Sequence, residues 1–224
     1  MNTIRFRNKN EKIWLNVASS TFVIKDYINL DNHPFLKWLP FFKTFSFLLS
    51  PGHKKYVQDF IDAKKIAPII THDCRKPLKF SDNSVDHILC SHFLEHIFPS
   101  EMLEVVSDFK RCLKPGGTIH IIVPDLNFYI QEYQNNKNNP EISSKAADYF
   151  ISNTILSRYN RGNFRFNLME FMGGFGLNHR WMYDYSSLES KISDLGFQIV
   201  KNINVPSSTY RLNDGSVHVY AMKL

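Results

Sequence analysis

The alternation of apolar and polar residues is most regular between residues 84 and 125. An apolar run rich in β-forming residues covers 85–90 and predicts a buried strand. This run ends at the polar cluster 91–96, which reads Ser-His-Phe-Leu-Glu-His. Polar side chains that directly follow a buried strand are typical of ligand sites in α/β proteins, so this cluster is the first candidate for chemistry.

A helix and a second strand follow the polar cluster. Apolar residues between 100 and 113 fall on one face of a helix, for which Ser100 is the expected N-cap. The Lys-Pro-Gly-Gly turn at 114–117 ends this helix, and the largely β-branched run 118–123 predicts a second buried strand. The whole stretch is therefore a βαβ unit.

The same pattern predicts further strands and helices on both sides of this unit. The strands cover 13–18, 27–30, 67–71, 197–205 and 216–222, and the helices cover 53–65, 126–133, 143–159 and 186–196. The last helix is expected to start with a capping box from Ser186 to Glu189. The last two strands form a predicted antiparallel pair. The first two lie closer together than the dozen or so residues of a parallel crossover, so any helix between them is expected to be rudimentary.

We interpret residues 1–224 as one domain with two added segments. The first is an aromatic insertion at 32–66, and the second is a helical insertion on the substrate side at 126–183, interrupted by a polar loop at 135–140. The density of Arg, Gly and aromatic residues near the end of the second segment suggests a pocket wall. A chain of 224 residues can bury a core of this size without disulfides or metals.

Composition limits the possible partners and the compartment. The net charge is +6, but no block of basic residues appears, so nucleic acid is not an expected partner. The three cysteines form no close pair and suit reduced thiols in a cytoplasmic protein. We expect neither a signal peptide nor a membrane span, and hence a cytoplasmic protein, with membrane contact only at its periphery.

Polar residues follow most of the expected parallel strands. They are Ser19 and Ser20, Asp31, Asp73, Ser91 and His92, and Asp125. Carboxylates at the ends of neighbouring strands can accept hydrogen bonds from ribose hydroxyls or from an adenine amino group. Each Asp taken singly could merely cap a turn, whereas the set together favours a nucleoside ligand.

Several of these segments together resemble one known family. They are residues 15–20, 27–31, 72–73, 80–86, 91–96, 113–117, 123–125 and 179–184. On these segments the chain resembles the class I S-adenosylmethionine-dependent methyltransferases, in particular small members associated with cell-surface polysaccharide biosynthesis. The resemblance implies an α/β, Rossmann-like, seven-stranded sheet, mostly parallel with an antiparallel last strand and with helices on both faces. It also implies S-adenosylmethionine as cofactor and a small-molecule or glycan acceptor.

The resemblance also assigns roles to individual residues. The expected cofactor-binding residues are Ala18, Ser19, Ser20, Asp31, Asp73, Cys74 and Ser91; the expected catalytic residues are His92, His96 and His179; and the expected substrate-binding residues are Asp125, Arg161, Arg180 and Trp181. His92 is the first candidate for a base that takes a proton from an acceptor hydroxyl. For each histidine the alternative is a packing or orienting role.

The first loop departs from the family pattern. Ala18-Ser19-Ser20 stands where the family usually has Gly-x-Gly, whose missing side chains let the backbone approach the cofactor. The alternative to an active methyltransferase is therefore a catalytically degenerate relative that keeps the fold as a binding protein.

Two further hypotheses arise from local patterns. The run His92-x-x-Glu95-His96 matches the inverted zinc-peptidase motif, which would require a helix that carries both histidines and another downstream ligand. Apart from this remote alternative, no metal is expected. The aromatic segment 34–49, with interspersed Lys37 and Lys43, is interpreted as a lid or packing segment, and alternatively as a contact with a membrane interface.

Overall fold

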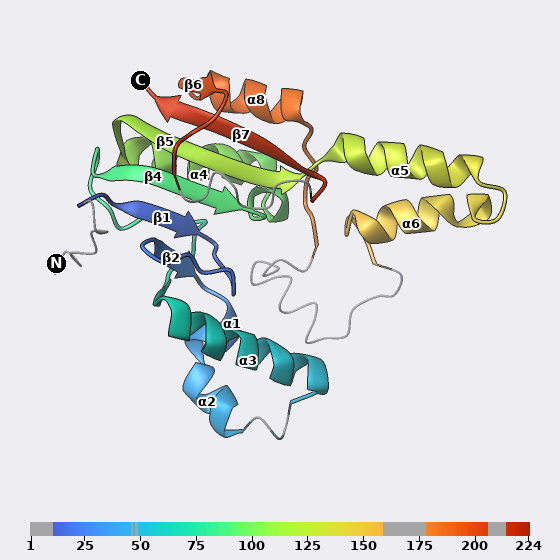
Figure 1. Ribbon diagram of the computed structural model, residues 1–224, viewed down its shortest axis with the longest axis horizontal. Coiled ribbons are helices and arrows are strands. Elements are labelled where there is room, and N and C mark those ends of the chain that lie inside the picture. The colour runs from blue at the N-terminus through green and yellow to red at the C-terminus, as the bar shows by residue number, and fades with distance from the viewer. Residues whose placement is uncertain (1–10, 46, 48, 159–177, 206–213) are drawn as a thin grey trace.

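The computed structural model describes residues 11–45, 47, 49–158, 178–205 and 214–224. Its centre is a seven-stranded sheet in the order β3-β2-β1-β4-β5-β7-β6 (Figure 1). The strands are β1 Trp14–Val17, β2 Ile28–Asp31, β3 Ile69–Thr71, β4 Val85–Ser91, β5 Leu113–Pro124, β6 Phe197–Val200 and β7 Ser216–Lys223. Strand β7 pairs antiparallel with both β5 and β6, and the other pairings are parallel. The predicted Rossmann-like sheet with an antiparallel last strand is confirmed.

The short connection between β1 and β2 contains no helix, as the sequence predicted. Hydrogen bonds of two buried asparagines hold this connection in place. Asn16 on β1 donates through Nδ2 to the carbonyl of Phe22 (2.8 Å) and to Asn29 Oδ1 (2.9 Å). Asn29 Oδ1 in turn accepts from the backbone N–H of Ile24 (2.9 Å). These side chains satisfy backbone groups that would otherwise be buried without partners.

The region between β2 and β3 folds as α1 (Pro34–Lys37), α2 (Leu39–Thr44) and α3 (Pro51–Ile66). Because β2 and β3 are parallel neighbours, α3 is the crossover that any such pair requires. The C-terminal half of the expected insertion is therefore part of the basic fold. Phe60 and Ala63 of α3 pack with Leu36 and Ile69 in a small apolar cluster of their own.

Helices α4 (Pro99–Cys112) and α8 (Tyr185–Asp194) bury their apolar faces in the main core. Their N-termini differ from the sequence prediction. Helix α4 starts after Phe98, whose N–H is accepted by Glu101 (2.8 Å), so Ser100 lies inside the helix. Pro99 explains this start, because proline suits the first helical position. Helix α8 is capped by Asp184, which accepts from the N–H of Ser187 (2.7 Å).

The turn predicted at 114–117 lies within β5 as an irregularity rather than ahead of it. The register of β4 against β5 shifts between Val85 and His87, whose partners are Leu113 and Thr118. Gly116 has a φ of 75°, which allows the chain to turn there. Sheet pairing thus begins at Leu113, five residues before the predicted start.

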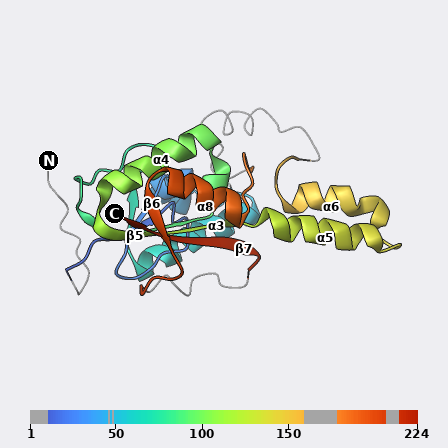
Figure 2. The same cartoon turned by 90° about the horizontal axis from the view of Figure 1, so that it is seen from above.

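Two helices project from the carboxyl end of β5 and run side by side (Figures 1 and 2). Helix α5 covers Leu126–Asn138, and α6 covers Ala146–Asn153 after the short helix η3, Ser143–Lys145. Most of the loop predicted at 135–140 is therefore helical, because the polar run there continues α5 on an exposed arm. In the described part of the chain, no helix has both the length and the apolar character that crossing a membrane requires.

Candidate functional site

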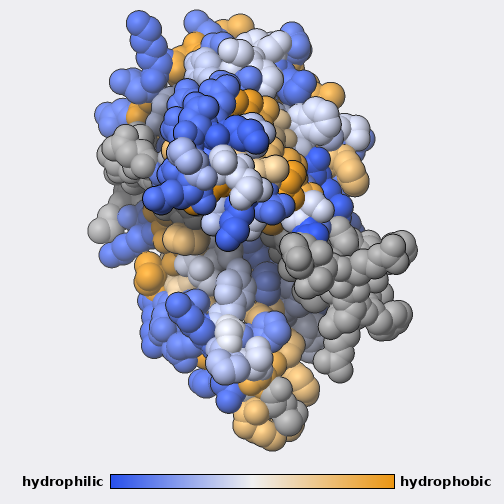
Figure 3. Space-filling view, turned by 90° about the vertical axis from the view of Figure 1, so that its right-hand side faces the viewer, coloured by the Kyte–Doolittle hydropathy of each residue, from blue (hydrophilic) through white to orange (hydrophobic). Residues whose placement is uncertain are grey.

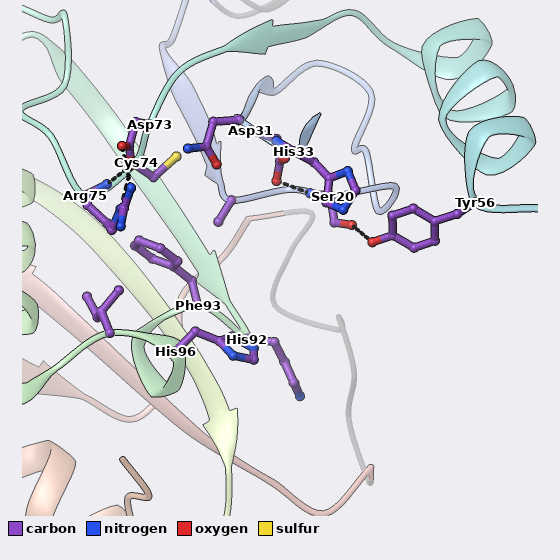
Figure 4. A pocket seen from close by; sticks show the side chains of 13 residues that line it. Ser20, Asp31, His33, Tyr56, Asp73, Cys74, Arg75, His92, Phe93 and His96 are labelled. Atoms are coloured by element: carbon purple, nitrogen blue, oxygen red, sulfur yellow. Dashed lines mark hydrogen bonds and ion pairs between the residues drawn. The ribbon is translucent and has the colours of Figure 1, made fainter. Parts of the chain in front are cut away.

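The carboxyl ends of β1, β2, β3 and β4 surround one pocket (Figure 4). Its lining comprises Ala18, Ser20, Asp31, Asn32, His33, Tyr56, Asp73, Cys74, Arg75, His92, Phe93, His96 and Ile97. Parallel strands present their carboxyl ends at one edge of a sheet, which explains why segments so distant in sequence meet here. This edge faces the viewer in Figure 3, where the surface is hollowed between the α5–α6 arm above and α3 below.

The loop after β1 has a glycine-like backbone although it contains no glycine. Ala18 has a φ of 54° and Ser20 a φ of 47°, both in the left-handed region that favours glycine. Their side chains are the smallest after glycine, and both residues line the pocket. At both positions the loop therefore has a backbone conformation that glycine favours, and it places only small side chains at the pocket. Ser19 between them is buried and is not among the lining residues, and its N–H donates to the carbonyl of Leu30 (2.9 Å).

Asp31, at the end of β2, is buried and holds the loops on either side of it. Its Oδ2 accepts from the N–H of Ser20 (2.8 Å), and its Oδ1 accepts from the N–H of His33 (2.7 Å). Burial raises the pKa of Asp31 above its ordinary value, although these backbone donors lower it in part. The backbone of Asn32 is a third donor to this carboxylate. A carboxylate has about four lone-pair sites, so three bonds still leave acceptor capacity for a ligand hydroxyl.

The segment after β3 supplies a second carboxylate. Asp73 pairs with Arg75 in a two-pronged contact, with Nε to Oδ1 at 3.0 Å and Nη2 to Oδ2 at 2.8 Å. Burial would raise the pKa of Asp73, but the bonds and charge of Arg75 outweigh it and the pKa is lowered. Cys74 is buried between them, and burial raises the pKa of its thiol, which stays protonated at neutral pH.

Helix α3 reaches the pocket through Tyr56. The Tyr56 hydroxyl and Ser20 Oγ lie 3.1 Å apart in a hydrogen bond. The ring of Tyr56 also packs on His33, with 4.9 Å between the ring centroids. Burial lowers the pKa of His33 to about 4, and its Nδ1 accepts from the N–H of Phe35 (3.2 Å) to cap α1. His33 is therefore neutral at physiological pH.

On the opposite wall lies His92, the first residue after β4. It has a φ of 53°, and its N–H donates to the carbonyl of Ile122 (2.8 Å). Its Nδ1 lies 3.1 Å from Ser91 Oγ, and its Nε2 lies 3.4 Å from Ser216 Oγ. Two hydroxyls, each able to donate or accept, therefore hold the imidazole ring of a residue that lines the pocket. Ser91 contacts His92 but does not line the pocket itself.

The other two candidate histidines lie against each other. The ring centroids of His96 and His179 are 4.9 Å apart, and His96 lines the pocket whereas the buried His179 does not. Burial lowers the pKa of both, that of His179 to about 4. Burial therefore favours the neutral form of both rings, which is the form that a base requires.

Three of the expected substrate-binding residues are not among the lining residues of this pocket, and the fourth lies outside the described residues. Asp125 caps α5 by accepting from the N–H of Asn127 (2.9 Å). Arg180 places its guanidinium 5.5 Å from the centroid of the Phe98 ring, and Trp181 is about half exposed (46%). Arg161 lies outside the described residues.

The zinc-peptidase motif does not have the geometry that it needs. Leu94–His96 form a single 3-10 turn, so His92 and His96 do not share a helix. Among the described residues, the cluster of possible metal ligands comprises Glu95, His96 and His179, without His92.

Sequence reasoning missed six of the lining residues: Asn32, His33, Tyr56, Arg75, Phe93 and Ile97. Phe93 lies within the cluster 91–96 but was given no role there. Four others lie one or two residues beyond a position already named, so extending each polar cluster would have found them. Tyr56 has no such signal, because only the packing of α3 brings it to the pocket.

Comparison with known proteins gives consistent results. A family model described as a methyltransferase domain matches residues 36–121. A search among curated proteins found no match to this chain. Among solved structures, a SAM-dependent methyltransferase from Methanosarcina mazei is 14% identical with a TM-score of 0.51, covering 94% of this chain and 92% of that one. A Pyrococcus horikoshii OT3 protein, also 14% identical with a TM-score of 0.51, covers 100% and 85% respectively.

At 14% identity the likeness to solved structures shows the fold alone. The family model shows in addition that residues 36–121 match a methyltransferase domain. The chain therefore has the Rossmann-like fold of the SAM-dependent methyltransferases, and the methyltransferase domain matched within it supports S-adenosylmethionine as its cofactor.

Proposed function

We propose that this protein is an S-adenosylmethionine-dependent methyltransferase that methylates an oxygen or nitrogen atom of a small-molecule or glycan acceptor. The observation that carries the proposal is the convergence of the Ala18–Ser20 loop, the Asp31 carboxylate and His92 on one pocket. The first two suit a nucleoside cofactor, and the third is a titratable side chain on the opposite wall.

The residues at the ends of β1, β2 and β3 fit the nucleoside part of the cofactor. The remaining acceptor capacity of Asp31 suits a ribose hydroxyl, while the Ala18 and Ser20 backbone offers close approach without a large side chain. Asp73 and Cys74 would meet the adenine, with Arg75 holding the carboxylate in place. When bound, the cofactor supplies an electrophilic methyl group on a good leaving group.

The chemical task left to the protein is positioning, exclusion of water and removal of one proton. We assign the proton transfer to His92, because it is the histidine that lines the pocket with both ring nitrogens beside hydroxyl groups. Ser91 and Ser216 would orient its ring so that one nitrogen accepts the proton of the acceptor. Asp125, Arg161, Arg180 and Trp181 remain our proposed contacts to the acceptor.

Calorimetric titration of the full chain with S-adenosylmethionine and S-adenosylhomocysteine tests this proposal. We expect binding in the micromolar range that is lost in Asp31→Ala and retained in Asp194→Ala, an exposed aspartate on α8. Failure of the wild-type protein to bind either molecule would instead favour a degenerate relative that keeps the fold.

The acceptor class and the cellular location of the reaction are inferred separately from the methyl transfer itself. We infer a cytoplasmic step in cell-surface polysaccharide biosynthesis, on the strength of the family resemblance. Transfer of a labelled methyl group to glycan precursors, absent in His92→Ala, would support this step. Transfer only to molecules without a sugar would contradict it.

A peripheral membrane contact would suit a lipid-linked acceptor. Trp38, Phe41, Phe45 and Phe47 are exposed around α2, at the lower end of the molecule in Figure 3. Phe35 instead packs inward, 4.8 Å from the Phe42 ring, so the segment is only partly a packing element. Flotation with anionic vesicles should weaken when the exposed aromatics are replaced by serine. Equal flotation of both proteins would remove this part of the proposal.

A further inference from the structure

Three potential metal ligands cluster beside the methyl-transfer pocket. Glu95, His96 and His179 each offer a ligand atom, and these atoms all lie within 4.8 Å of one another. Glu95 is fully buried, His179 is 7% exposed, and His96 also lines the pocket. The proton transfer proposed above is assigned to His92 and uses none of these three side chains.

Backbone hydrogen bonds bring the three side chains together from distant parts of the chain. The carbonyl of Glu95 accepts from the N–H groups of Arg180 (2.6 Å) and Trp181 (3.1 Å). The N–H of His179 donates to the carbonyl of Ile155, just beyond α6 (3.1 Å). The 3-10 turn after β4, the end of α6 and the segment before α8 are thus joined at this cluster.

The hydrogen bonding of His96 directs one ring nitrogen toward the carboxylate. Nδ1 lies 3.0 Å from the carbonyl oxygen of Asn178, which can only accept, so Nδ1 carries the proton. Nε2 then presents a lone pair 3.8 Å from Glu95 Oε1. A backbone carbonyl that fixes the tautomer of an imidazole in this way is the usual outer partner of a metal-bound histidine.

His179 is arranged in a corresponding way. Its ring makes a hydrogen bond with the backbone of Thr154, while its buried Nδ1 has no hydrogen-bond partner among the described residues. Leaving a buried polar atom unsatisfied costs about 1–3 kcal/mol, so such an atom calls for an explanation. A lone pair directed at a cation supplies one.

We propose that Glu95, His96 and His179 bind one divalent transition-metal ion of the zinc class. Two imidazole nitrogens and a carboxylate oxygen form the ligand set of open zinc sites, in which a fourth position is left for water or substrate. Ligand atoms about 2.1 Å from a tetrahedral ion lie roughly 3.4 Å apart, so the 3.8 Å between Nε2 of His96 and Oε1 of Glu95 needs little adjustment.

The position of the ion has one consequence for catalysis. His96 also lines the pocket, and an ion with an open ligand position on that side could hold an acceptor oxygen and lower the pKa of its proton. This consequence rests on the proposed function, whereas binding of the ion does not.

Titration of the chelator-treated full chain with Zn²⁺, followed by calorimetry, tests the site. We expect one equivalent to bind, with affinity lowered at least about tenfold in His179→Ala and in Glu95→Gln. His53→Ala, at an exposed histidine on α3, is the matched control and should bind as the wild type does. His92→Ala should also keep the ion, which separates this site from the zinc-peptidase motif.

Two further measurements keep the outcome clear. Glu95 is buried and its variant could fold poorly, so the melting temperature of the wild-type protein is measured with and without Zn²⁺; a rise is expected if the folded state binds the ion. Absence of binding and of any rise would overturn the proposal, as would unchanged binding in a folded His179→Ala protein. Titration of the same samples with S-adenosylmethionine reports separately on the proposed function.

Discussion

Ala18 and Ser20 adopt a backbone conformation that glycine favours, in the loop that our proposal assigns to the cofactor. Both adopt positive φ angles, and their small side chains leave the pocket open. An L-residue in this region costs roughly 1–2 kcal/mol, which the surrounding hydrogen bonds must offset. The bond from the Ser20 N–H to the Asp31 carboxylate is one of those that hold the loop.

This strain gives a prediction at the residue scale. Ala18→Gly should raise the free energy of unfolding by about 0.5–1 kcal/mol, because glycine adopts a positive φ without steric cost. The same replacement at Ala63, in the middle of α3, should lower it by at least about 1 kcal/mol. Urea denaturation of both variants measures the contrast. A loss of stability in Ala18→Gly would contradict the strained conformation.

Among the elements, the connection from β1 to β2 is unusual because it joins two parallel strands without a helix. Hydrogen bonds of two asparagines hold it instead. Asn29 has no exposed surface and bonds with the backbone of Ile24 and with Asn16. These bonds set the direction in which the chain leaves β1. They therefore support the loop that carries Ala18 and Ser20, although neither asparagine lines the pocket.

Asn29→Ala should lower the free energy of unfolding by about 2–4 kcal/mol, since several buried polar groups lose their partner at once. Asn135→Ala on α5, where the side chain is exposed, is the matched control and should change stability by less than about 0.5 kcal/mol. Chemical denaturation gives both values. Equal effects of the two replacements would show that the asparagine pair does not hold the connection.

Across the whole molecule, buried histidines link stability to pH. Burial lowers the pKa of His87 to about 3 and that of His33 to about 4, from the ordinary 6.5 expected in the unfolded chain. Between these values and pH 6.5 the unfolded chain binds more protons than the folded protein does. The free energy of unfolding must therefore fall as the pH drops below about 6.5.

We expect the urea midpoint to fall between pH 7 and pH 5, and to fall less steeply in His87→Gln. His87 is buried beside Thr118 Oγ1 (2.9 Å), so glutamine can keep a hydrogen bond there without titrating. His53→Gln, at an exposed site, should leave the slope unchanged. A His87→Gln slope equal to that of the wild-type protein would exclude His87 as a source of the pH dependence.

At this scale the positions of the strands along the chain could be predicted from the sequence, and the site only in part. Local patterns placed the strands because a buried strand needs a continuous apolar run, and they placed Asp31, Asp73 and His92 because these residues follow such runs directly. The N-caps of α4 and α8 were each placed two residues too late, at Ser100 and Ser186 in place of Phe98 and Asp184. Pro99 at the first helical position fixes the start of α4, and the Asp184 carboxylate caps α8 in place of a serine.

The sequence by itself therefore determined which segments are buried, the alternation of strands and helices, and the polar residues at the strand ends. The tertiary structure decided what depends on distant segments meeting: Tyr56 reaching Ser20, and His179 lying against His96 and Glu95. The physical reason is the distance along the chain over which each signal acts. Apolar periodicity and turn chemistry act over a few residues, whereas a site assembled from several loops depends on how whole elements pack.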